Sequence, residues 1–252
     1  MQGRLVKKFQ GKYQAHPIDD WEKEFKIASK YKIKNIEFII DSYFPEMNPL
    51  LHEEGIKKIQ FLQKKYGVKV YSICADYFMD NPIHVKKFNN NYPLDFLKVL
   101  LSSANKLNIT NIILPCVDQS SVSKNKKYKS NLIKNILSIK KVFEKKKVNL
   151  LLETDLPPKE IKNICNKINS KFFGINYDTG NSASLNYNID EEFSNYGKFI
   201  KNIHIKDRKK FGKTVRLGKG NSNFKKLFKN LKNIKNKGNL ILQTARSKEN
   251  KH

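Results

Sequence analysis

The stretch Asn202–Asn221, NIHIKDRKKFGKTVRLGKGN, predicts a strand that ends at a polar site. Phe199–Ile205 reads as a buried apolar strand with His204 near its end, and charged residues follow directly. A glycine-rich turn, Leu217–Asn221, then precedes a new helical pattern. A histidine at a strand end beside such a turn is typical of a ligand site. Similar polar residues at other strand ends would complete it.

Strand and helix patterns alternate along the whole chain. The strands are continuous apolar runs, which favours a parallel sheet covered on both faces. The expected strands cover residues 1–5, 35–41, 68–75, 109–116, 148–152, 172–177, 199–205 and 239–242. The expected helices cover residues 21–31, 53–66, 93–107, 131–147, 157–168, 189–196 and 223–234. This pattern predicts a single (β/α)₈ TIM-barrel domain over residues 1–252. A doubly wound sheet is the alternative, but no strand is followed by GxGxxG.

The C-terminal end of the pattern is short. Too few residues follow Arg246 for an eighth outer helix. We therefore expect the final outer helix to be missing and apolar barrel wall to be exposed between the last strand and the first. An exposed apolar surface of this kind suggests a homodimer contact.

The net charge of +27 comes from 50 Lys and Arg against 23 Asp and Glu. Such an excess normally suggests a polyanionic partner. Here the lysines are spread through nearly every helical segment, without a basic stripe interleaved with aromatic residues. This distribution argues against nucleic acid as the main partner, and a codon bias toward Lys, Asn and Ile would also produce it.

The N-terminus, the hydropathy and the cysteines indicate the compartment. The N-terminus lacks the apolar region of a secretory signal, and no apolar run is long enough to span a membrane. Cys74, Cys116 and Cys165 are far apart and form no CxxC pair. These features predict a reducing, cytoplasmic compartment.

The last four expected strands end in potential metal ligands: Glu153, Asp178, His204 and Gln243. Each lies about one strand–helix unit after the previous one, so four adjacent strand ends would converge at one end of the barrel. Two carboxylates, an imidazole and an amide oxygen suit one divalent ion such as Mn²⁺, Mg²⁺, Co²⁺ or Zn²⁺. Taken singly, each carboxylate would serve equally well as a helix cap, and His204 as a core histidine.

The chain resembles the xylose-isomerase-like TIM barrels, which include sugar (phosphate) isomerases and epimerases and the relatives of endonuclease IV. The resemblance covers nearly the whole chain, and single pieces of it are weak. It rests on the ordered set MQGRL (1–5), IEFIID (36–41), ICADYFMD (73–80), LLETD (151–155), NYDTGNSAS (176–184), NIHIKDR (202–208), LGKGN (217–221) and ILQTAR (241–246). By this similarity, Glu153, Asp178 and His204 match three of the family's four metal ligands. The fourth is usually glutamate, and this chain has Gln243.

The resemblance also implies a mechanism. In related ketose epimerases two glutamates bind the metal and act as acid and base on opposite faces of the substrate, through a metal-stabilised enediolate. Glu153 matches one of them and could remove the proton, whereas the amide of Gln243 cannot act as a base. Either the reaction is a one-base isomerisation, or the chemistry differs, or a second group returns the proton. The candidates for that group are Glu37, Asp76, Lys206 and His16.

The expected substrate is a small sugar or sugar phosphate. The glycine loop resembles the family's loop after strand seven, where free N–H groups could hold an anion, although a plain turn explains it equally well. Arg4 and Arg208 could instead be salt-bridged residues of the barrel. The predicted substrate-binding residues are Arg4, Glu37, Asp76, Asn181, Arg208, Gly218, Gly220 and Arg246, with Lys206 as a catalytic residue beside Glu153.

These features together predict a divalent-metal-dependent isomerase or epimerase. Two alternatives stay open. One is a metal-dependent phosphodiesterase like endonuclease IV, although such relatives use many more histidine and acidic ligands than a chain with five histidines offers. The other is a barrel that has lost its activity.

Overall fold

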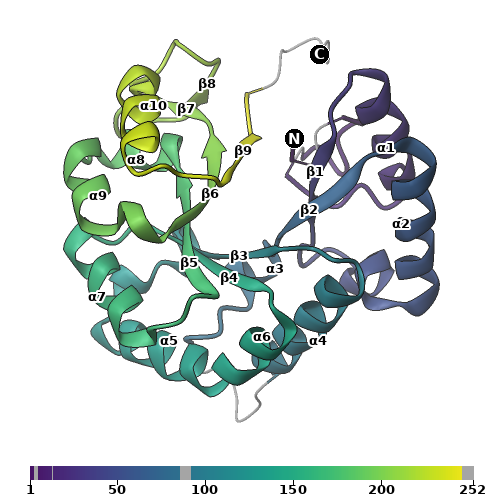
Figure 1. The fold of residues 1–252 in the computed structure, drawn as a ribbon, viewed down its shortest axis with the longest axis horizontal. Helices are drawn as coiled ribbons and strands as arrows, with labels where there is room; N and C mark the ends of the chain where they lie inside the picture. The colour runs from purple at the N-terminus through teal and green to yellow at the C-terminus, as the bar shows by residue number, and fades with distance from the viewer. Residues whose placement is uncertain (3–4, 13, 86–91, 246–252) are drawn as a thin grey trace.

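Seven parallel strands form the central sheet of the computed structural model, which describes residues 1–2, 5–12, 14–85 and 92–245. The strands are β1 (Asn35–Ile39), β2 (Lys69–Cys74), β3 (Asn111–Cys116), β4 (Asn149–Thr154), β5 (Phe173–Asp178), β6 (Ile200–Ile205) and β9 (Asn239–Leu242), hydrogen-bonded in this order. They curve into a nearly closed ring with helices outside it (Figure 1). This arrangement confirms the predicted TIM barrel.

Ten helices are seen in the described part of the chain. They are α1 (Trp21–Lys30), α2 (Glu53–Tyr66), α3 (Tyr77–Asp80), α4 (Tyr92–Lys106), α5 (Lys126–Ser138), α6 (Lys140–Lys146), α7 (Pro158–Ile168), α8 (Thr179–Leu185), α9 (Ile189–Tyr196) and α10 (Phe224–Asn233). Short 3₁₀ turns cover Pro45–Met47, Pro49–Leu51, Asp118–Ser120, Val122–Lys124 and Gly197–Phe199. The helix expected over residues 131–147 is two helices, α5 and α6, which meet at Ile139. The sequence did not predict α3, α8 or the hairpin of β7 (Asp207–Arg208) and β8 (Thr214–Val215).

Of the first strand predicted over residues 1–5, the structure describes residues 1, 2 and 5, and only Gln2 of these shows strand pairing. Gln2 forms an isolated parallel bridge with Glu37, and the carbonyl of Met1 accepts the Glu37 N–H at 2.8 Å. On the other side, the Gln2 N–H donates to the Leu242 carbonyl at 3.3 Å. The N-terminus therefore joins β1 to β9 where a full strand was expected. Arg4 lies outside the described residues.

Burial explains why the strands read as continuous apolar runs. All six residues of β3 are buried, because one face of the strand lines the barrel and the other packs against the helices. The apolar face of each outer helix is buried in the same core, as with Phe25 of α1, Ile59 of α2 and Ile164 of α7.

The last strand has an exposed outer face, as expected. Leu240 and Leu242 are 45% and 41% exposed, whereas Ile241 and Gln243 on the other face are buried. Within residues 243–245, the part after β9 that the structure describes, no helix forms. The homodimer that this surface suggested stays a prediction.

No helix of the described residues is long and apolar enough to cross a membrane. The three cysteines are buried and form no disulfide.

Helix α2 packs closely against the turn Pro49–Leu51 at Gly55. For Gly55→Ala, helix propensity and packing therefore predict opposite changes in the free energy of unfolding. A Cβ added at Gly55 would lie 2.2 Å from the Pro49 carbonyl oxygen. We expect Gly55→Ala to lower the free energy of unfolding by about 1–3 kcal/mol through overpacking, although the same change in an open helix would raise it by about 1 kcal/mol. Urea unfolding would measure the difference. Lys57→Ala, at an exposed position of the same helix, is the control, and a stabilised Gly55→Ala protein would contradict the packing.

Candidate metal centre

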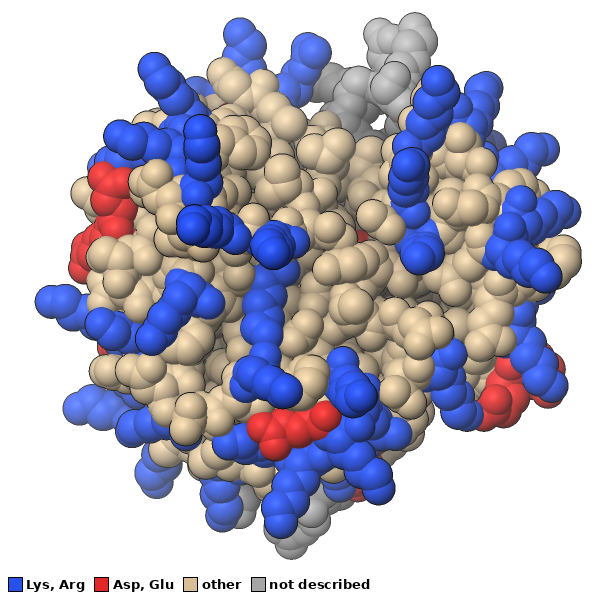
Figure 2. All heavy atoms as spheres, viewed as in Figure 1, with Lys and Arg blue, Asp and Glu red and all other residues tan. Residues whose placement is uncertain are grey.

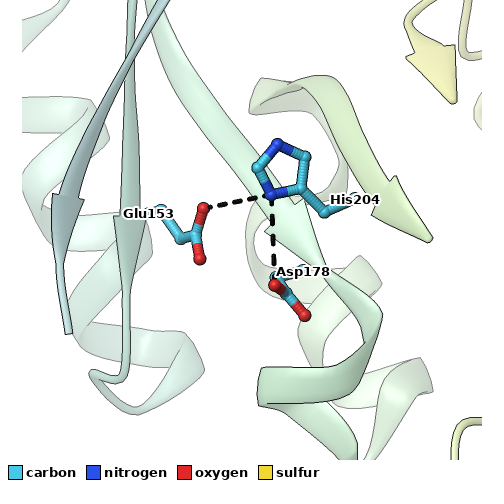
Figure 3. A group of neighbouring side chains, drawn as sticks. All are labelled: Glu153, Asp178 and His204. Atoms are coloured by element: carbon cyan, nitrogen blue, oxygen red, sulfur yellow. Dashed lines mark ion pairs between the residues drawn. The ribbon is translucent and has the colours of Figure 1, made fainter. Parts of the chain in front are cut away.

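Three of the four predicted ligands meet at the carboxyl ends of neighbouring strands. Glu153 lies in β4, Asp178 ends β5, and His204 lies in β6, directly opposite Asp178 in the strand register. All three are buried, and one ligand atom from each lies within 4.8 Å of the others. His204 Nδ1 is 3.4 Å from Glu153 Oε2 and 4.0 Å from Asp178 Oδ2 (Figure 3).

The hydrogen bonding of Asp178 leaves one of its oxygens without a partner. Oδ1 accepts the N–H groups of Gly180 and Asn181 at 2.7 and 2.8 Å, which caps α8 and fixes the carboxylate. Oδ2 is buried and accepts no hydrogen bond from any described residue. Its charged neighbours are Lys206 Nζ at 3.6 Å and His204 Nδ1 at 4.0 Å, both beyond hydrogen-bond distance. A buried carboxylate oxygen that accepts no hydrogen bond is costly. A divalent cation among these two carboxylates and one imidazole would compensate that cost, so the residues fit a metal ion.

His204 is held from both sides of its ring. Nε2 lies 2.9 Å from Oε1 of Glu37, and Nδ1 lies 3.1 Å from the side-chain nitrogen of Asn176. Burial alone would lower the pKa of His204, but the Glu37 carboxylate raises it to about 9. Burial alone would raise the pKa of Glu37, and the charge of His204 lowers it. The two groups therefore form a buried ion pair in the metal-free protein.

Glu153 is held by two amides. Asn176 donates to Oε2 at 2.6 Å, and Asn181 donates to Oε1 at 2.9 Å. Burial raises the pKa of Glu153 to about 7, and the nearby Asp178 carboxylate adds to this effect. A carboxyl group with this pKa can accept and release a proton near neutral pH.

Gln243 lies at the end of the neighbouring strand. Its N–H donates to the Ile205 carbonyl at 3.1 Å, and its side-chain nitrogen donates to Gln2 Oε1 at 2.7 Å. Its buried amide oxygen has no hydrogen-bond partner among the described residues. No hydrogen bond or ion pair within that part of the chain joins Gln243 to the other three ligands. Its role as fourth ligand stays a prediction.

Cationic side chains lie beside the three ligands. Nζ of Lys206 is 3.6 Å from Asp178 Oδ2, and its side chain is partly exposed. Arg208 donates to Oδ1 of Asn181 at 2.9 Å. Because Asn181 in turn donates to Glu153, a hydrogen-bonded chain runs from Arg208 to the carboxylate.

The glycine loop corrects an expectation. The N–H groups of Gly218 and Gly220 donate to Asp207 Oδ2 at 2.9 and 2.8 Å, and that of Ser222 donates to Oδ1 at 3.0 Å. These groups are therefore not free to hold a phosphate, because a buried carboxylate of the chain itself occupies them. A Cβ at Gly220 would lie 2.1 Å from Asp207 Oδ1, which explains the glycine there.

The other residues predicted as substrate contacts or as a second acid or base lie outside the glycine loop. Asp76 is half-buried and accepts hydrogen bonds from Gln14 and Cys74, and burial raises its pKa to about 6. His16 is buried, which lowers its pKa to about 4. Glu37 is fully buried beneath His204. Arg246, like Arg4, lies outside the described residues.

Sequence reasoning missed the polar residues that support the ligands. Asn176 and Asn202 each lie two residues before a ligand on the same strand, so their side chains point to the same face. Asn202 donates to Asn176 at 2.8 Å, which links β6 to β5 inside the barrel. An asparagine two positions before Asp178 and another two positions before His204 were the signal that could have identified them, although Leu151 and Ile241 stand at the matching positions before Glu153 and Gln243.

Solved structures with the same fold support this description. The chain is similar to a xylose isomerase-like TIM barrel protein from Mycobacterium smegmatis in complex with magnesium (TM-score 0.71, 14% identity, covering 92% of this chain and 84% of that one). It is also similar to 3-keto-D-glucoside 4-epimerase from E. coli (TM-score 0.72, 13% identity, 98% and 93% covered). A third similar structure is D-psicose 3-epimerase with D-tagatose from Clostridium cellulolyticum H10 (TM-score 0.71, 14% identity, 88% and 78% covered). At these identities the likeness shows the fold.

Sequence comparison is more specific. No curated protein matches the chain. The family model for the xylose isomerase-like TIM barrel matches residues 25–252. This match spans most of the sequence and agrees with the observed barrel, so the chain belongs to the xylose isomerase-like TIM barrel family.

Proposed function

We propose that this protein is a divalent-metal-dependent isomerase or epimerase of a small sugar or sugar phosphate. The observation that carries the proposal is the group Glu153, Asp178 and His204, whose ligand atoms lie within 4.8 Å of one another. The similar solved structures include two sugar epimerases, which supports this class of reaction.

Each residue of the group has a part in the proposed reaction. Glu153, Asp178 and His204 would hold the ion, with the free amide oxygen of Gln243 as the fourth donor. A bound divalent ion supplies a Lewis acid that polarises a carbonyl and makes the neighbouring C–H more acidic. Glu153 would remove that proton as the general base, because binding of the ion keeps its carboxylate ionised.

The proton must then return to the substrate, either from a second group or from Glu153 itself. Glu37 is fully buried and hydrogen-bonded to His204, and the buried His16 is a poor proton carrier because its pKa is about 4. Lys206 is partly exposed and lies beside Asp178, so we assign it the role of orienting the substrate oxygens and donating a proton. A one-base isomerisation through Glu153 alone is the variant that needs no second group.

The glycine loop would not hold a substrate phosphate, so other residues would have to bind the substrate. Because Asp207 occupies the loop N–H groups, a substrate anion would have to be held by side chains such as Arg208 and Lys206. Asn181 and Asp76 remain proposed substrate contacts for sugar hydroxyls. Both have side-chain oxygens that can accept hydrogen bonds.

Surface charge favours no nucleic-acid site. Lys and Arg side chains are scattered over both the rim and the middle of the face shown in Figure 2, among uncharged residues. Residues other than the described Glu153, Asp178 and His204 form no further group of three potential ligands within the described part of the chain. We therefore propose a small-molecule substrate rather than a nucleic acid. A homodimer through β9 and a cytoplasmic location are also part of the proposal.

Glu153→Gln should abolish proton abstraction while preserving the size of the side chain. We expect solvent-deuterium incorporation into a panel of ketoses and ketose phosphates, followed by NMR, to fall at least about 10²-fold. Glu54→Gln, at an exposed position of α2, is the matched control. Full exchange by a metal-loaded Glu153→Gln protein would exclude Glu153 as the base.

Metal binding should release protons, because the ligands carry them in the metal-free protein. His204 has a pKa of about 9 and Glu153 a pKa of about 7. Each must be deprotonated to bind an ion, so affinity should rise with pH, most steeply below 7 and more gradually up to 9. Calorimetric titration with Mn²⁺ in buffers of different ionisation enthalpy would count the protons. Affinity independent of pH between 6 and 9 would contradict this assignment.

The number of bound ions separates the isomerase from the phosphodiesterase alternative. One cluster of three ligands predicts about one ion per chain by elemental analysis. About three ions per chain would favour an endonuclease IV-like activity instead.

A further inference from the structure

A buried hydrogen bond crosses the barrel beneath the candidate metal centre. Glu37 Oε1, from β1, lies 2.9 Å from Nε2 of His204, from β6. These strands are not neighbours in the sheet, since β9 and the N-terminal bridge lie between them. Both side chains are completely buried. Glu37 therefore has no surface available to a substrate and contacts the centre only through the imidazole.

The Glu37 carboxylate is itself fixed by its surroundings. Its second oxygen accepts the Ser72 hydroxyl at 2.6 Å, and Asn202 Nδ2 lies 3.5 Å from it. The backbone of Glu37 is held by Met1 and Gln2. A carboxylate held from several strands can fix the orientation of the ring that it contacts.

The contact determines which nitrogen of His204 is available. When Nε2–H donates to Glu37, the lone pair of Nδ1 points toward Glu153 and Asp178, at 3.4 and 4.0 Å. This tautomer belongs to the neutral ring, which a bound cation requires, because both nitrogens of the protonated ring carry hydrogen. Asn176 Nδ2 lies 3.1 Å from Nδ1. Glu37 also places a negative charge behind the imidazole, at a centre whose predicted fourth donor is the neutral Gln243.

We propose that Glu37 is a positioning residue that fixes His204 as an Nδ1 donor and thereby sets the affinity of the centre for a divalent cation. This inference rests on the proposed metal centre. It reassigns Glu37, which the sequence placed among the substrate contacts or as a second acid or base. Removing such a carboxylate behind a ligating histidine typically costs 10–100-fold in metal affinity.

The experiment compares Mn²⁺ affinity by calorimetry and the visible absorption of bound Co²⁺ in four full-length proteins: wild type, Glu37→Gln, Glu37→Ala and Glu54→Gln. We expect Glu37→Gln, which keeps the shape and an acceptor oxygen but removes the charge, to bind Mn²⁺ about 10-fold more weakly. Glu37→Ala, which also frees the ring, should lose about 100-fold and change the Co²⁺ spectrum. Glu54→Gln makes the same chemical change at an exposed position of α2 and should bind as tightly as wild type.

The outcomes separate the two proposals. If wild type binds neither ion, the metal centre and the proposed function fail. If wild type binds and both Glu37 variants bind equally well with the same Co²⁺ spectrum, the role of Glu37 is overturned. Circular dichroism of the metal-free proteins shows whether each variant folds. Should Glu37→Ala not fold, the near-isosteric Glu37→Gln decides, and unchanged affinity in it counts against the proposal.

Discussion

The requirement that every buried polar group have a partner organises the interior of this barrel. Strands that must be apolar to form the ring nevertheless carry Glu37, Glu153, Asp178 and His204 at or near their carboxyl ends. Burial would be costly for each of them alone. Glu37 is compensated by His204 and Ser72, and Glu153 by two asparagines. Three buried side-chain oxygens of the described residues accept no hydrogen bond, on Asp178, Asn202 and Gln243, and two of these residues are predicted ligands.

The same requirement explains why the glycine loop is not a phosphate site. Asp207 is fully buried, and its carboxylate accepts three backbone N–H groups of the loop after β8. An N–H cluster of this kind suits an anion, as its sequence indicated. The anion that it holds is the Asp207 side chain, so the N–H cluster stabilises the fold of the loop beside the candidate metal centre. Substrate charge must then be recognised by side chains such as Arg208.

Periodicity and chain order carried most of the prediction. Continuous apolar runs identified the strands, and the polar residues that end them identified Glu153, Asp178 and His204, because parallel strands of one barrel end on the same side. The first strand is only partly described: residues 1–2 show bridge pairing to β1 and β9, and two residues that would extend it lie outside the described part. The asparagines that support the ligands were missed, since their position two residues before a ligand recurs only at Asp178 and His204.

The sequence by itself determined the order of the strands, the polar residues at their ends that are candidate ligands, and the glutamine at position 243, because these depend on local periodicity and on residue type. Tertiary structure alone decided which groups satisfy one another across the barrel. Glu37 and His204 are 167 residues apart in the sequence and are separated by two intervening sheet positions, and nothing local joins them. Their contact, like that of Gln2 with Gln243, exists because closure of the ring brings distant strands around one interior, where low polarity makes each pairing necessary.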